Sequence, residues 1–194
     1  DDATVVSSLI AGDSDVGTFI AAGDTPALTE GGNIEVVLVP SGYNEGWFFN
    51  LRDSGHPALD DVNVRRALVM LFNRDQINAD LNLGLVQTGS SFWENTPYQR
   101  PDAAPIPYDP AMANQLLDEA GWVDSNGDGT RDKDGVELVL RYVTNQRQLR
   151  KDIQAIVQQE FEAAGVGVDI QNFDSDIFFA SYGEGGPVSI GEYD

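Results

Sequence analysis

The chain has 194 residues, 41% of them hydrophobic, so it is long enough to build a core for one domain or slightly more. Its 32 acidic and 11 basic residues give a net charge of −21. Nucleic acids and anionic lipids bind through Lys and Arg, so this charge argues against both as partners. The absence of cysteine excludes disulfides, thiolate catalysis and metal sites built on Cys.

The sequence shows neither the pattern of a membrane-spanning helix nor that of a signal peptide. No apolar run approaches the ~18 residues of a membrane-spanning helix, and no charged segment followed by an apolar stretch opens the chain. The sequence starts at Asp1 without a methionine. We therefore expect a piece of a longer protein from which any targeting segment has been removed.

The first fifty residues alternate short apolar runs with turn residues. A helix is expected within 5–12, and a short second helix is expected ahead of residue 34. Strands are expected in the runs 15–24, 34–40 and 47–51. The run 34–40 has the strongest strand signal, because it is rich in Val and Ile and is bounded by glycine and proline.

A helical period begins after the acidic pair Asp60 and Asp61 and predicts an amphipathic helix. Asn73 is expected to cap a continuation of this helix through Ile77. The buried stripe of the first part is expected to consist of Val64, Leu68, Leu71 and Phe72.

The second half of the chain predicts an α/β fold. Residues 85–107 are rich in Pro, Ser, Gly and Asn and predict a long irregular connection, and Asp109 with Pro110 then predicts a helix start. The patterns at 136–143, 149–161 and 166–171 indicate a strand, a helix and a strand. Their close succession predicts a βαβ unit at about 136–172 with parallel strands.

Residues that could catalyse a reaction are few. His56 is the only histidine and no GxSxG motif accompanies it, so we interpret His56 as an exposed or capping turn residue. Carboxylate pairs are too easily found among 32 acids to indicate a glycosidase. The run GEGGP at 183–187 lacks the spacing and the preceding strand of a nucleotide-binding motif.

The acidic loop DSNGDGTRDKDG at 124–135 is the strongest local motif, because oxygen ligands fall at alternate positions as in an EF-hand loop. However, Gly135 stands where a bidentate Glu belongs, and a strand rather than a helix is expected next. The alternative is a polar turn in which Asp and Asn side chains bind their own backbone. The candidate calcium ligands are Asp124, Asn126, Asp128, Thr130 and Asp132.

Several segments together resemble family 5 extracellular solute-binding proteins, the dipeptide- and oligopeptide-binding proteins of ABC importers. The segment FFNLRDSGHPALDDVNVRRALVMLFNRDQI at 48–77 carries the Asn, Pro, acidic pair, VRxAL helix and Asn-Arg turn of that family. The segment YDPAMANQLLDEAGW at 108–122, the acidic turn at 124–135 and LIAGDSDVG at 9–17 also resemble family elements, and all lie in the family's order.

The resemblance implies part of a type II periplasmic-binding-protein fold, in which two α/β lobes joined by a hinge close over a ligand. It assigns residues 1–50 to the end of lobe I with the hinge strand, and 51–194 to the first part of lobe II. It also implies a protein that is no enzyme and that delivers a solute, most often a peptide, to an ABC permease. Such a protein is extracellular or periplasmic, and the full-length protein can carry a lipid anchor. It requires no cofactor, and calcium is the one ion that the sequence offers as a candidate ligand.

The loop GSSFWENTPY at 89–98 is the expected ligand-facing wall, because aromatic side chains on a long loop suit an adaptable apolar pocket. The candidate substrate-binding residues are Phe92, Trp93, Asn95 and Tyr98. Packing of these rings onto their own lobe is the alternative.

Arg65 and Asp60 are expected to form a structural ion pair or a cap. Two other functions stay open: a calcium-dependent surface or adhesion module, and a fragment of an extracellular hydrolase.

Overall fold

The structure, a computed structural model, describes residues 2–194 and divides into two compact units. Unit 1 contains the residues up to Asn44 together with Arg74–Pro105, and unit 2 contains Glu45–Asn73 together with Ile106–Asp194. These units differ from the predicted division near residue 50, and the assignment of the two parts to lobes stays a prediction. Within 2–194, no helix combines the length and the hydropathy that crossing a membrane requires.

Unit 1 is built from short helices. Helix α1 (Asp2–Ala11) packs against α2 (Thr25–Glu30), and α4 (Arg74–Asn82) packs against the 3-10 helix η1 (Ala22–Asp24). The predicted helices in 5–12, ahead of residue 34, and through Ile77 are thus confirmed. The apolar side chains buried in this unit are Val6, Leu28 and Ile77.

The three strands predicted in 15–24, 34–40 and 47–51 are wrong. The first run is irregular and ends in η1, and the other two form neither helix nor strand. Val37 and Val39 are 68% and 74% exposed. A β-rich composition describes a side chain that suits a pleated, half-buried surface, but a strand also needs a backbone partner, and no described strand pairs with these runs.

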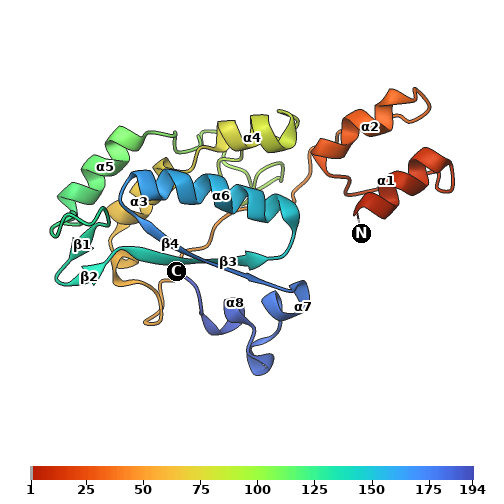
Figure 1. The fold of residues 1–194 in the computed structure, drawn as a ribbon. Helices are drawn as coiled ribbons and strands as arrows, with labels where there is room; N and C mark the ends of the chain where they lie inside the picture. The colour runs from red at the N-terminus through yellow and green to blue at the C-terminus, as the bar shows by residue number, and fades with distance from the viewer. Residues whose placement is uncertain (1) are drawn as a thin grey trace. The chain divides into compact units, whose positions relative to one another are not determined.

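Two helices contribute buried side chains to the core of unit 2. Helix α3 (Val62–Met70) begins at Asp61, whose carboxylate accepts from the N–H of Asn63 at 2.8 Å. Helix α5 (Pro110–Glu119) begins at Asp109, whose Oδ1 accepts from Met112 N at 2.9 Å. The two helices pack against each other (Figure 1). Their fully buried side chains are Val64, Ala67, Leu68, Ala113 and Leu117.

The predicted βαβ unit is confirmed. Strand β3 (Val139–Asn145) is followed by α6 (Gln148–Ala163) and by β4 (Gly167–Phe173), and the two strands are parallel with Val139 opposite Gly167. A Cβ at Gly167 would lie 2.9 Å from the Val139 side chain, so this close approach requires glycine. The expected strand 136–143 is interrupted at Leu138, because β2 (Val136–Glu137) instead pairs antiparallel with β1 (Asp132–Lys133).

Helical segments lie on two sides of the β3–β4 pair. Helix α6 lies over one face, and the C-terminal segment with α7 (Ser175–Phe178), η3 (Tyr182–Glu184) and α8 (Pro187–Ile190) lies over the other (Figure 1). This segment ends against β3, because the side chain of Asp194 forms an ion pair of 2.8 Å with Arg141 and its N–H donates to the Arg141 carbonyl. Because Asn145 pairs with Phe173 and α6 begins at Gln148, the carboxyl ends of both parallel strands lie beside the start of α6.

Candidate functional site

The predicted aromatic loop lies in unit 1 and is exposed. Phe92, Trp93 and Tyr98 are 61%, 51% and 75% exposed, and their rings meet edge to face with centroid distances of 5.5 and 5.6 Å. The rings therefore contact one another while a large part of each remains accessible. Their role in binding a substrate stays a prediction.

The residue that anchors this loop is Glu94, which the sequence did not single out. Its side chain is buried and accepts hydrogen bonds from the N–H and hydroxyl of Ser90 and from the amide of Gln99. The hydrogen bonds from Ser90 lower the pKa of Glu94 below its usual range. Asn95, a predicted binding residue, has a positive φ of 57° and donates to the Ser41 carbonyl at 3.2 Å, which ties the loop to residues 41–44.

The acidic loop is closed by its own hydrogen bonds. Asp124 accepts from the N–H groups of Gly127 and Gly129 at 2.7 and 3.0 Å. Asp128 accepts from Thr130 N at 2.8 Å and from the Asn126 amide, and both bonds lower its pKa. This is the polar turn that the sequence offered as the alternative to a metal site.

The same geometry tests how well the loop suits calcium. Asp132 accepts hydrogen bonds from the N–H and the hydroxyl of Ser125. Within residues 2–194, three or more His, Cys, Asp or Glu side chains are nowhere gathered around a point that could hold a metal ion. The carboxylates are therefore not gathered for an ion in this arrangement, and calcium binding by the loop stays a prediction of the sequence.

A recess beside this loop is dominated by Arg131, which the sequence left unassigned. Its guanidinium donates to the carbonyls of Ala164 and Trp122, to Asn114 Oδ1 and to Asp118. These acceptors occupy all three guanidinium nitrogens, so the recess offers a solute no free cation. Arg131 joins α5, the loop and the end of α6, which is a structural role.

His56 also has a structural role, as predicted. Its Nδ1 accepts from Ala58 N at 3.2 Å and caps η2 (Pro57–Asp60), while its Nε2 lies 2.9 Å from the Glu137 carbonyl. Arg65 donates to the backbone carbonyls of Leu59 and Asp60, so its observed contact with Asp60 is made to the carbonyl.

The carboxyl ends of β3 and β4 bring together polar side chains from segments far apart in the sequence. The Asn145 amide donates to Ser175 Oγ at 3.0 Å, and the Gln146 amide donates to the Asn172 carbonyl at 3.2 Å. In open α/β sheets, ligands bind outside the carboxyl ends of the parallel strands. Among the sites described here, this edge of unit 2 is the one best suited to a ligand.

Two arginines stand at this edge. Arg147 precedes α6, whose first turn contains no acidic residue, and Arg150 lies within that turn. The free N–H groups at the start of a helix favour an anion, and the two guanidinium groups add to this effect. Arg150 Nη2 donates to Glu45 Oε1 at 2.8 Å, Arg147 Nη1 lies 4.0 Å from the same oxygen, and the guanidinium of Arg150 lies 5.9 Å from the centre of the Phe179 ring.

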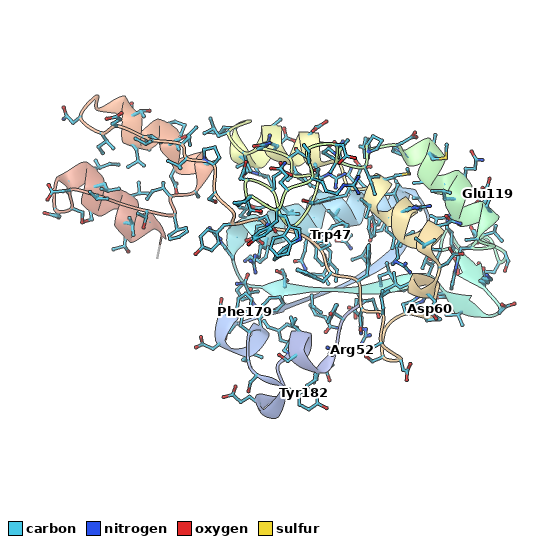
Figure 2. The ribbon with its side chains drawn as sticks, turned by 180° about the vertical axis from the view of Figure 1, so that it is seen from behind. Trp47, Arg52, Asp60, Glu119, Phe179 and Tyr182 are labelled. Carbon is cyan, nitrogen blue, oxygen red and sulfur yellow. The ribbon has the colours of Figure 1, made fainter. Side chains whose placement is uncertain are left out.

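An aromatic cluster holds the segment that carries Glu45. The indole of Trp47 donates to the Tyr142 hydroxyl at 2.9 Å and packs against the rings of Phe72, Tyr142 and Phe161 (Figure 2 shows Trp47 and Phe179). Burial raises the pKa of Tyr142 to about 12. The cluster thus positions Glu45 beside the two arginines, an arrangement capable of binding a carboxylate.

Comparison with known proteins identifies the relatives of this chain. The family of bacterial extracellular solute-binding proteins, family 5 (middle region), matches residues 1–192. The oligopeptide-binding protein AppA of Bacillus subtilis is 34% identical over 117 residues, covering 57% of this chain and 21% of AppA. The nickel-binding periplasmic protein of Escherichia coli is 26% identical over 129 residues, covering 65% of this chain and 24% of that protein.

A solved structure agrees with these matches. The structure of Bacillus subtilis AppA in complex with a nonapeptide has a TM-score of 0.69 and 26% identity, covering 90% of this chain and 34% of that one. The chain therefore spans about a quarter of the length of the curated relatives it matches. The names of these relatives describe binding proteins rather than enzymes. The α/β fold and the resemblance drawn from the sequence are confirmed: the chain belongs to the bacterial extracellular solute-binding proteins of family 5.

Proposed function

We propose that this chain is part of a binding protein that captures peptides outside the cytoplasmic membrane and delivers them to an ABC-type permease. The observation that carries the proposal is the similarity to AppA, an oligopeptide-binding protein whose structure was solved with a nonapeptide. The full-length protein then works in the periplasm or the extracellular space, where a lipid anchor would keep it near the permease.

The geometry of unit 2 supports a peptide as cargo. A peptide with a free carboxyl terminus presents one carboxylate, and at the edge of β3 and β4 Arg150 already contacts the carboxylate of Glu45 at 2.8 Å, with Arg147 4.0 Å away. Polar side chains such as Asn145 and Gln146 stand at the same edge. Arginine binds carboxylates well because its planar fork matches their two oxygens.

The other functions considered from the sequence are less well supported. The acidic loop uses its carboxylates for its own turn, which removes the main argument for a calcium-dependent adhesion module. His56 caps a helix and lies against a backbone carbonyl, which argues against a role as the base of a hydrolase. A nickel chelate is the second candidate cargo, since the nickel-binding protein of Escherichia coli is among the relatives.

The test is native mass spectrometry of the full-length protein purified without denaturation. We expect a ladder of bound masses spaced by amino-acid residues, which is the signature of a peptide carrier with loose sequence preference. A single metal-containing mass would replace the peptide by a chelate. A protein that retains nothing, and that binds neither peptides nor nickel in calorimetry, would contradict the proposal.

A further inference from the structure

Glu45 occupies the arginine pair in a way that a stronger carboxylate could replace. It contacts Arg150 through one oxygen at 2.8 Å, and its distance of 4.0 Å to Arg147 is at the limit of an ion pair. Arg150 Nε is buried and has no hydrogen-bond partner among the described residues. The contact is therefore end-on and single, whereas arginine and carboxylate pair best through two parallel hydrogen bonds.

The surroundings of Glu45 differ from those of its partner. The Glu45 side chain is 56% exposed and belongs to a segment without helix or strand, next to Gly46. The Arg150 side chain is only 22% exposed, belongs to the sixteen-residue helix α6 and lies over the Phe179 ring. The exposed end of this contact is the carboxylate, so Glu45 can move into solvent while Arg150 stays in place.

We infer that Glu45 is an internal carboxylate that fills the Arg147–Arg150 site in the free protein and competes with the carboxylate of an incoming solute. This inference rests on the proposed function, since it assigns a regulator to the proposed binding site. Solute binding then displaces Glu45 into solvent, and the affinity for carboxylate-bearing solutes is lowered by the competition. A solute without a carboxylate leaves Glu45 in place, so the competition does not lower its affinity.

The experiment measures calorimetric affinities of the full-length protein for two probes, tetra-alanine with a free carboxyl terminus and tetra-alanine amide. Glu45→Gln removes the internal anion while keeping the size of the side chain. We expect this substitution to increase the ratio of the two affinities, free acid over amide, by about fivefold or more. Glu119→Gln is the matched control, because Glu119 is an exposed acid of α5 that lies far from Phe179 in Figure 2.

The outcomes separate the two claims. If the wild-type protein and Glu45→Gln bind neither peptide, the proposed function fails and the inference fails with it. If both bind the two peptides and Glu45→Gln leaves the ratio of their affinities unchanged, only the inference fails. A lower affinity of Glu45→Gln for the free acid would show that Glu45 positions Arg150 for the solute, which also overturns the competition. If Glu119→Gln raised the affinity for the free-acid peptide equally, the effect would come from the change in net charge, and the inference would fail.

Discussion

At the scale of single residues, Arg131 joins several parts of unit 2. Its side chain is 12% exposed. It donates hydrogen bonds to acceptors on α5, at Trp122 just before the acidic loop, and at the end of α6. Arg131→Lys keeps the charge, but an ammonium cannot reach acceptors spread around a planar fork. We expect a loss of about 2–4 kcal/mol in the free energy of unfolding, measured by urea denaturation.

Arg66→Lys is the control for this substitution, because Arg66 is an exposed residue of α3 in the same unit. It should change the free energy of unfolding by no more than about 0.5 kcal/mol. Equal effects of the two substitutions would contradict the role assigned to Arg131.

Tyr142 gives the protein a pH dependence with a defined sign. Burial raises the pKa of Tyr142 in the folded protein to about 12, whereas the unfolded value is near 10. Its contribution to stability is fully present below pH ~10 and is lost as the pH rises through ~12, because the unfolded chain ionises first. Between these values the wild type should lose on the order of 1–3 kcal/mol relative to Tyr142→Phe in urea denaturation.

Tyr108 is the control for the titration. A hydrogen bond to Glu160 raises the pKa of Tyr108 to about 12 as well, but Tyr108 is exposed at the surface. In absorbance titrations at alkaline pH, Tyr108→Phe and Tyr142→Phe should each remove one tyrosine from the late-titrating fraction. Loss of stability at high pH in Tyr142→Phe as steep as in the wild type would contradict this account.

At the scale of elements, the acidic loop is a turn that Asp124 holds closed. Asp124→Ala leaves the N–H groups of Gly127 and Gly129 without their acceptor. We expect both amides to exchange hydrogen at least about tenfold faster, since local opening no longer breaks these bonds. Asp134→Asn is the control, because Asp134 is exposed and asparagine tolerates its positive φ of 52°.

Calcium can be tested in the same exchange experiment. If about 1 mM calcium protects Gly127 and Gly129 in the wild type but not in Asp124→Ala, the loop binds the ion with the affinity of an extracellular site. Equal exchange with and without calcium would leave the loop as a turn.

The elements that the sequence predicted correctly are those whose stability is local or regular. The helix stripes, the caps at Asp61 and Asp109 and the βαβ unit all follow from short-range patterns. The predicted strand at 34–40 was wrong because strand formation depends on a partner strand elsewhere in the chain. The sequence pattern indicates which side chains suit a sheet, but whether a strand forms depends on a partner strand in the folded chain.

The candidate site was the hardest part to predict, for a physical reason. Glu45 and Arg150 are 105 positions apart, and neither lies in a motif. Arg147 and Arg150 do stand at the start of a predicted helix that follows a strand, and this combination was the one available signal. The aromatic residues 92, 93 and 98 could be proposed as a binding loop from composition alone. Composition does not indicate what they bind.

At the scale of the whole molecule, the net charge of −21 acts on every acidic side chain. With 32 acids and 11 bases, most carboxylates have no basic partner available, and the pair Arg100–Asp102 is highly exposed. Repulsion among like charges destabilises a compact chain, and salt screens it. Salt also weakens ion pairs, but exposed pairs contribute little. Screening should therefore remove more repulsion than attraction.

We accordingly expect the melting temperature to rise by about 2–4 °C, equivalent to ~1 kcal/mol, when NaCl increases from about 0.02 M to about 0.5 M. The double variant Asp13→Asn and Asp53→Asn tests the cause, because both residues are exposed and the change removes two negative charges. It should melt higher than the wild type at low salt and respond less to added salt. A melting temperature that falls with salt would mean that ion pairs such as Arg141–Asp194, and not the excess of acids, dominate the electrostatics of the fold.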